Sequence, residues 1–127
     1  MKIVATIARY LLGLIFTIFG LNGFLNFIPM GPIPPLALQF VGALAQSHLM
    51  IVIFVIEIIG GVLLLANRFV PLALTLLGPV IVNILLFHLF MAPAGLPLAL
   101  VVTVLWIVVA FRVWPVFAGL LQHRATA

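Results

Sequence analysis

Long apolar stretches alternate with short polar or proline-rich segments along the whole chain. Four of these stretches approach the roughly 20 residues that an α-helix needs to cross a bilayer. They cover about residues 5–27, 49–66, 69–90 and 96–116. The pattern therefore predicts an all-α integral membrane protein, in which four transmembrane helices form a bundle within a single membrane domain covering residues 1–127.

The segments between the apolar stretches predict how the spans are connected. Residues 28–35 contain four prolines, which prevent the first helix from continuing and indicate a loop. Residues 36–46 have apolar side chains at helical spacing but are too few to span a bilayer. They predict a short helix that lies at the membrane interface or against the bundle. Residues 67–68 and 91–95 are tight turns, so the later spans are antiparallel neighbours.

The composition supports a membrane location and excludes several kinds of chemistry. The chain is 68% hydrophobic and only 5% charged, and its mean hydropathy is +1.57, values far from those of soluble domains. It has no cysteine, which excludes thiolate catalysis, disulfide exchange and cysteine-ligated metal or iron–sulfur sites. Any redox role therefore requires a bound cofactor or a partner protein. The few basic residues are spread over the chain and form no stripe, so nucleic acid is not an expected partner.

The basic residues predict the orientation of the spans. Lys2, Arg9, Arg68, Arg112 and Arg124 all fall on one side of the predicted topology, and the two loops on the other side have none. The positive-inside rule then places both termini in the cytoplasm. These side chains are also expected to contact anionic membrane lipids.

Glu57 is the only acidic residue of the chain, and it lies in the middle of the second apolar stretch. A carboxylate at that depth costs a few kcal/mol or more, so it must be neutral, paired or in contact with water. Every lysine and arginine is more than about 10 Å of helix away. His88 is therefore the only candidate cationic partner, and desolvation favours the protonated form of Glu57.

Several polar residues are expected near the depth of Glu57, in the outer half of the membrane. At about 1.5 Å of rise per residue, one polar side chain on each span lies roughly 8–12 Å below the outer end. Two more form a tier above them. These residues are the candidate ligand-binding set, with Glu57 as the candidate proton-exchanging residue and no catalytic residue assigned: Asn22, Asn26, Glu57, Asn83, His88 and Thr103. The alternative is that the amides and Thr103 are interhelical hydrogen-bonding groups without a ligand.

The histidines and phenylalanines give weaker signals. One histidine without a second at ligand spacing is poor support for a metal site, so no metal is expected, and a haem held by His48 and His88 is disfavoured. Four phenylalanines of the first span have two possible roles: they line a hydrophobic ligand pocket, or they face lipid and the core of the bundle. The second role is the more common one for phenylalanine in such a helix. These residues are Phe16, Phe19, Phe24 and Phe27.

Small residues occur on the first two spans around the predicted polar layer. Glycine lets the backbones of neighbouring helices approach closely, as membrane bundles require. Close approach is therefore predicted at Gly13, Gly20, Gly23, Gly60 and Gly61.

Parts of the first three spans resemble a known family, the DoxX-like proteins. The resemblance rests on residues 13–16 (GLIF), 20–24 (GLNGF), 57–61 (EIIGG), 67–74 (NRFVPLAL) and 82–90 (VNILLFHLF). DoxX-like proteins are small four-helix proteins of the bacterial inner membrane, and their name comes from relatives of the membrane subunit of thiosulfate:quinone oxidoreductase. The resemblance implies a multi-pass inner-membrane protein, with quinone as candidate cofactor and a redox protein as candidate partner. Gly23 departs from the family pattern, because many relatives have a lysine there.

Three functions are compatible with these features, and the residues do not decide whether the protein is an enzyme. The first is an accessory membrane subunit of a quinone-linked redox system, which binds a lipophilic small molecule at the polar layer. The second is a non-enzymatic membrane scaffold that docks a partner protein, with the polar layer in a structural role. The third is a small-solute carrier with Glu57 in a water-filled path, which requires a homo-oligomer because four helices enclose only a narrow conduit.

Overall fold

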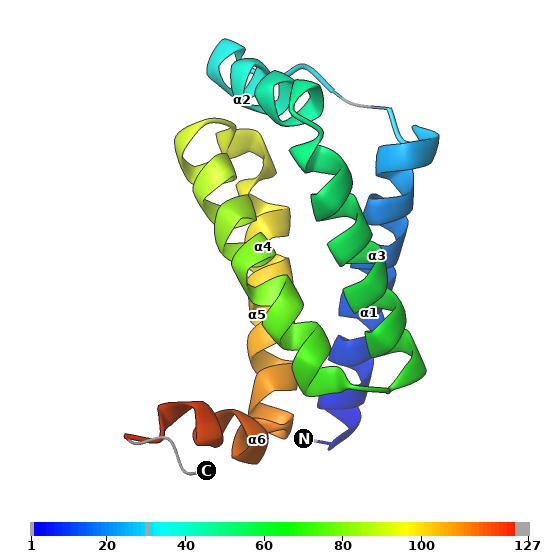
Figure 1. Cartoon of the computed structure of the whole chain (residues 1–127), viewed down its shortest axis with the longest axis vertical. Coiled ribbons are helices and arrows are strands. Elements are labelled where there is room, and N and C mark those ends of the chain that lie inside the picture. The colour runs from blue at the N-terminus through cyan, green and yellow to red at the C-terminus, as the bar shows by residue number, and fades with distance from the viewer. Residues whose placement is uncertain (1, 30, 124–127) are drawn as a thin grey trace.

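The computed structural model describes residues 2–29 and 31–123, and every regular element in these two ranges is a helix (Figure 1). Four helices are long and apolar enough to cross a membrane. They are α1 (Lys2–Leu25), α3 (Leu49–Ala66), α4 (Val70–Phe90) and α5 (Leu96–Arg112), the last of which continues from the 3₁₀ turn η1 (Pro93–Gly95). The prediction of an all-helical chain with four long apolar helices is therefore confirmed.

A shorter helix, α2 (Pro35–Gln46), lies across one end of the bundle (Figure 1). Pro35 occupies the first turn of α2, where the missing N–H of proline has no intrahelical partner to lose. The Phe40 ring of α2 lies 5.6 Å from the Phe87 ring of α4, and α2 also contacts α3. The short helix predicted over residues 36–46 is present, and its location at a membrane interface stays a prediction.

Asparagine residues in the left-handed region end two of the long helices. Asn26 follows α1 with φ 51° and donates its backbone N–H to Asn22 O at 2.8 Å. Asn67 follows α3 with φ 54°, and the next residue, Arg68, donates its N–H to Leu63 O at 3.0 Å. This backward hydrogen bond is the Schellman arrangement, which asparagine tolerates better than most residues do. It makes the connection between α3 and α4 a tight hairpin.

The fourth span is shorter than its apolar pattern indicates. The sequence predicts a helix to residue 116, but α5 ends at Arg112 and the separate helix α6 (Trp114–Ala118) turns away from the bundle (Figure 1). Pro115 explains the break, because its ring clashes with the carbonyl of Phe111 and it has no N–H to continue the helix.

The bounds of the first span also differ from the prediction: α1 covers residues 2–25 rather than 5–27. Arg124 lies outside the described residues.

The core of the bundle is apolar and receives side chains from all four long helices. Its buried members are Ala8, Leu12, Phe16, Leu64, Val70, Ala73, Leu74, Leu77, Ile81, Val102, Val109 and Ala110. Trp106 ties α5 to α4, because its indole N–H donates to Leu74 O at 2.9 Å. The outward faces are also apolar, as shown by the exposed side chains of Ile7, Leu11 and Leu14 on α1. A large exposed apolar surface is what helices in contact with lipid present.

Glycine brings the backbones of α1 and α3 into contact. A Cβ added at Gly13 would lie 2.9 Å from Gly61 O, and one added at Gly61 would lie 2.7 Å from Thr17 N. On the neighbouring side of α3, a Cβ at Gly60 would lie 2.7 Å from Leu77 Cγ of α4. These distances are too short for any real side chain, so the close approach predicted at these three glycines is confirmed.

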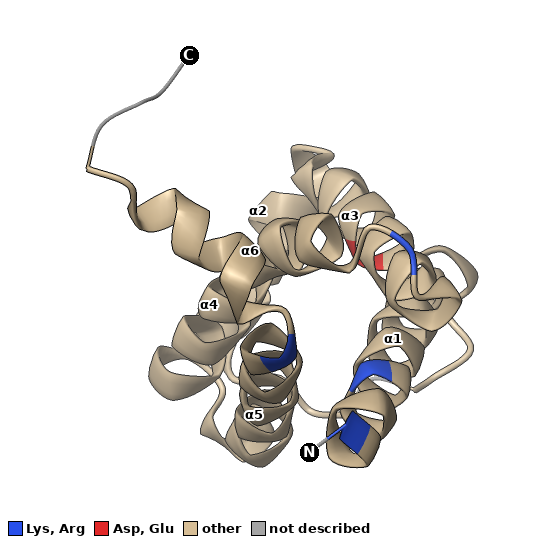
Figure 2. Ribbon diagram, turned by 90° about the horizontal axis from the view of Figure 1, so that it is seen from below, with Lys and Arg blue, Asp and Glu red and all other residues tan. Residues whose placement is uncertain are grey.

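The described basic residues gather at one end of the bundle, which we call the basic end (Figure 2). Lys2, Arg9 and Arg112 line one cavity there with Asn67, and Arg68 follows Asn67 in the hairpin. The opposite end, which we call the α2 end, carries α2, the loop after α1 and the turn between α4 and α5 (Figure 1). The described lysine and arginine residues therefore share one end, and the side of the membrane that this end faces stays a prediction.

Candidate ligand-binding site

A cavity of about 520 Å³ lies towards the α2 end and is lined by residues of α1 to α5. We call it the Glu57 cavity. Its polar lining residues are Asn22, Asn26, Glu57 and His88. The remaining lining residues are apolar or small: Ile15, Phe16, Phe19, Gly23, Val41, Ala45, Met50, Phe54, Ile84, Phe87, Leu98, Ala99 and Val102. A mainly apolar wall with a few converging polar groups is typical of sites for small molecules.

Glu57 lies in the middle of α3 and is 8% exposed. Gly60 and Gly61 share its helix face at i+3 and i+4, and they pack against α4 and α1 respectively. The same close contacts therefore turn Glu57 towards the bundle interior rather than towards lipid, as an ionisable side chain within a membrane requires. Among the described residues that line the cavity, His88 alone can carry a positive charge.

The imidazole of His88 is held by the turn that follows α4. His88 Nδ1 lies 3.1 Å from Ala92 O, and because a carbonyl only accepts, Nδ1 is the protonated nitrogen. In the neutral ring Nε2 is then an acceptor that can bind a ligand. Gly95 lies directly against the ring, because a Cβ there would overlap Nδ1 and Cε1. The position of the ring therefore depends on the glycine that precedes α5.

Asn22 and Asn26 contribute two amides from the end of α1. Asn22 is half-buried, and its Oδ1 accepts the backbone N–H of Ile28 at 2.7 Å. Its Nδ2 group is consequently the part that can donate to a bound molecule. Asn26 lies at the rim, where its side chain is exposed and also lines the cavity. The chain reversal after α1 thus positions both amides.

Asn83 and Thr103 do not join these residues. Asn83 lines a second cavity of about 530 Å³ with Glu57, which we call the Asn83 cavity, and its Nδ2 donates to Pro79 O at 3.0 Å. Thr103 donates its hydroxyl to Ala99 O at 2.8 Å and lines neither cavity. Similar depth does not ensure a shared face: Asn83 and His88 are five residues apart, which places them about 140° apart around α4.

The Glu57 cavity and the Asn83 cavity adjoin. Five residues line both of them: Val41, Met50, Glu57, Ile84 and Phe87. The side chain of Glu57 therefore lines two mainly apolar cavities. The Glu57 cavity also has two amides and an imidazole, and the Asn83 cavity has a single amide. An amphipathic molecule with a polar head and an apolar body suits this arrangement.

Sequence reasoning missed Thr17 and several apolar lining residues. The Thr17 hydroxyl is buried, has no hydrogen-bond partner among the described residues and lies against Gly61. The i, i+4 spacing of Gly13 and Thr17 was the available signal, because two small residues at that spacing mark close helix contacts in membranes.

Of the phenylalanines of α1, Phe16 and Phe19 line the Glu57 cavity. Residue Phe24 instead packs edge-on against Phe54, with ring centroids 5.9 Å apart.

Comparison of the chain with protein-family models, curated proteins and solved structures finds no match. The resemblance to DoxX-like proteins therefore stays a prediction.

Proposed function

We propose that this is a DoxX-like, multi-pass protein of the bacterial inner membrane, with both termini in the cytoplasm and α2 at the outer interface. Four long apolar helices support the multi-pass topology. The orientation is supported by the lysine and arginine residues of the basic end, because cytoplasmic loops carry an excess of these residues. In this orientation the Glu57 cavity belongs to the outer half of the membrane.

The function that the geometry supports best is binding of a lipophilic small molecule of the quinone class, by an accessory membrane subunit of a redox system. The observation that carries this proposal is the location of the only acidic side chain, which is 8% exposed and lines a mainly apolar cavity with His88 and two asparagines. Quinone oxygens accept hydrogen bonds, which Asn22 Nδ2 and a protonated Glu57 can donate. Phe16, Phe54 and Phe87 offer apolar surface to the ring and tail.

Proton exchange gives Glu57 a role beyond binding. Reduction of a quinone to a quinol takes up two electrons and two protons. In the proposed role a redox partner protein supplies the electrons, and Glu57 relays the protons one at a time, giving one to a head-group oxygen and regaining one from water. His88 Nε2 accepts a hydrogen bond from the quinol hydroxyl. The chain has no cysteine, so the electrons do not pass through a thiol of this chain.

Two substitutions of Glu57 separate binding from proton exchange. Glu57→Gln keeps a hydrogen-bonding group of the same shape, so binding of a short-chain ubiquinone to the purified protein should change by less than about 3-fold. Quinone-dependent activity of the membranes should nevertheless fall about 100-fold, since loss of a general acid–base group has effects of this order. Glu57→Leu should weaken binding about 10-fold. Titration of the protein with the quinone and assay of membranes measure the two effects.

The result against the proposal is equally specific. A purified protein that contains no quinone, binds none on titration and retains quinone-dependent membrane activity as Glu57→Gln is not a quinone-binding subunit. Thr103→Val is the matched control, because Thr103 is a polar residue of the same bundle that lines neither cavity. Its binding and activity should equal those of the unmodified protein.

A second candidate function, a membrane scaffold that docks a partner protein, is favoured by a different observation. Asn83 and Thr103 hydrogen-bond to their own helices, and glycine contacts hold α1, α3 and α4 together. If the protein is only a scaffold, Glu57→Gln keeps both fold and function, whereas Gly60→Leu disrupts the packing against Leu77. Circular dichroism with a partner pull-down distinguishes this outcome from the quinone proposal.

A further inference from the structure

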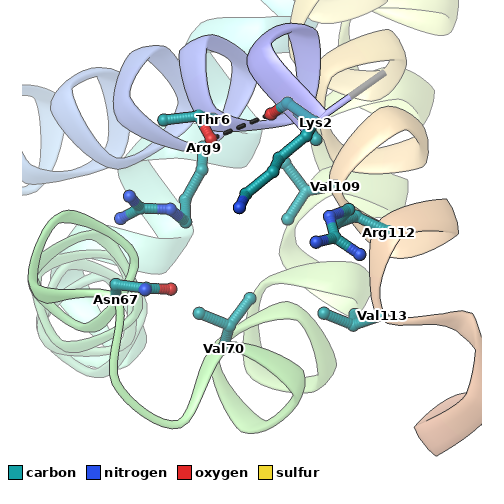
Figure 3. A pocket seen from close by; sticks show the side chains of 9 residues that line it. Lys2, Thr6, Arg9, Asn67, Val70, Val109, Arg112 and Val113 are labelled. Atoms are coloured by element: carbon teal, nitrogen blue, oxygen red, sulfur yellow. Dashed lines mark hydrogen bonds between the residues drawn. The ribbon is translucent and has the colours of Figure 1, made fainter.

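A third cavity, of about 350 Å³, lies at the basic end. We call it the basic cavity. Figure 3 shows the side chains of Lys2 from α1 and Arg112 from α5 extending towards the same space, whereas the guanidinium of Arg9, at its edge, is turned towards the end of α3. Asn67 of the hairpin and Val70 at the start of α4 complete its other side. Three cationic residues from two helices, far apart in the sequence, therefore line one cavity.

The guanidinium of Arg9 is anchored in this cavity. Its Nη1 donates a hydrogen bond to Leu64 O, near the end of α3, and the group also lies 4.4 Å from the centroid of the Tyr10 ring. An arginine has five N–H donors, so this anchor leaves several for a ligand. Arg9 is half-buried, whereas Lys2 and Arg112 are exposed. The cavity thus has one hydrogen-bonded, half-buried cation and two exposed ones.

No acidic side chain compensates the positive charge of the basic cavity. The only acidic side chain is Glu57, which lines the two cavities of the opposite half. Helix ends offset part of the charge, because Arg9 donates to Leu64 O in the last turn of α3 and Arg112 lies in the last turn of α5, where the helix dipole favours cations. Each helix C-terminus carries only about half a negative charge. Three like charges that line one cavity favour an anion between them.

We propose that the basic cavity binds a phosphate group, either in the headgroup of an anionic phospholipid or as free phosphate. Arginine is suited to phosphate because its planar fork donates two parallel hydrogen bonds, and lysine adds a compact point charge. The Thr6 hydroxyl donates its hydrogen bond to Lys2 O of the same helix at 2.9 Å. Asn67 is therefore the neutral polar residue of the cavity that is best placed to donate to the phosphate.

The volume and position of the basic cavity favour a headgroup over a lone ion. About 350 Å³ lies within the usual range of small-molecule sites, roughly 300–1,000 Å³. The exposed helix faces around it are apolar, as shown by Ile3 and Ile7 on α1 and Phe111 on α5. A phospholipid can place its phosphate in the cavity while its chains run along these faces.

Native mass spectrometry of the full-length protein in detergent tests this proposal. The probes are phosphatidylglycerol, phosphatidylcholine and inorganic phosphate, each added alone, followed by inorganic phosphate in competition with phosphatidylglycerol. Arg112→Gln and Lys2→Gln each remove one charge from an exposed side chain, so the fold should be retained. Arg68→Gln is the matched control: it removes the same charge at the same end from a residue that does not line the cavity.

Phosphatidylglycerol should bind in preference to phosphatidylcholine, and Arg112→Gln or Lys2→Gln should weaken that binding roughly 5-fold each. Arg68→Gln should change it by less than about 2-fold. If inorganic phosphate displaces the lipid, the site accepts free phosphate; if it does not, the phosphate must belong to a lipid headgroup. Equal weakening by Arg68→Gln, or binding of neither phosphatidylglycerol nor phosphate, overturns the proposal.

Discussion

The two ends of the bundle use the same long helices but offer opposite chemistry. The Glu57 cavity, near the α2 end, has one acid, two amides and an imidazole in a mainly apolar wall. The described residues that line the basic cavity include three cations and no acid. Between them lies the apolar core, with Leu12, Leu74 and Leu77 fully buried. The separation keeps the acid from pairing with the described arginines, and in our proposals each end binds a different kind of molecule.

The contact between α1 and α3 is common to both ends, so its disruption should have the largest effect. A Cβ in Gly61→Ala would meet two backbone atoms, Thr17 N at 2.7 Å and Gly13 O at 2.8 Å, which cannot move away as a side chain can. We expect the free energy of unfolding to fall by about 1–3 kcal/mol, with weaker binding at both cavities. Unfolding in mixed micelles and ligand titration measure these changes.

Gly42→Ala controls for the substitution itself. Nothing lies within 4 Å of a Cβ at Gly42 in α2, and alanine is the better helix former, so stability should rise by up to about 1 kcal/mol. If Gly61→Ala is as stable as Gly42→Ala, the α1–α3 contact does not hold the two ends together.

An intermediate effect, confined to the α2 end, is expected for Gly95→Ala. The new Cβ would overlap the His88 ring, so the ring must leave its position and the hydrogen bond from Nδ1 to Ala92 O is lost. Binding of a short-chain ubiquinone should weaken about 5-fold, the value of one hydrogen bond. Phosphatidylglycerol binding at the basic end should not change, and a parallel loss there would show that the two ends are coupled.

The smallest effect should come from Thr103→Val. The Thr103 hydroxyl bonds to its own helix, so quinone binding should change by less than about 2-fold. Asn22→Leu, which removes an amide from the Glu57 cavity, should weaken binding about 5-fold in the same titration. Equal effects of the two substitutions would contradict the distinction that the structure draws between these residues.

The apolar pattern was enough to predict the long helices, because a membrane span requires a minimum length of apolar sequence. The prediction for residues 49–66 agrees with α3 residue for residue. The prediction from the apolar pattern was wrong for the end of the fourth span, where apolar sequence continues past the end of the helix. Residues 113–116 are apolar, but Pro115 stops α5. Hydropathy measures solubility in lipid, and helix termination depends on backbone hydrogen bonds.

The rise per residue predicts the level of each candidate residue along its helix, but not the direction in which its side chain points. From the rise per residue, Asn22, Glu57 and Thr103 are expected at similar levels along the bundle axis. The rotation of each helix about its own axis decides which of these side chains face the same cavity. That rotation is fixed by contacts between helices, such as Gly61 against Thr17. For the same reason, the sequence indicated that Lys2, Arg9 and Arg112 share one side but not that they line one cavity.

The single acidic side chain, Glu57, also allows the protein to be labelled at one known position. Because Glu57 is the only carboxyl side chain and lines mainly apolar cavities, a lipid-soluble carbodiimide has a single side-chain target. The adduct changes the mass of one peptide, so its yield can be measured in intact membranes without purification. A molecule that occupies the cavity shields the carboxyl, and the rate of labelling then reports occupancy in the native bilayer.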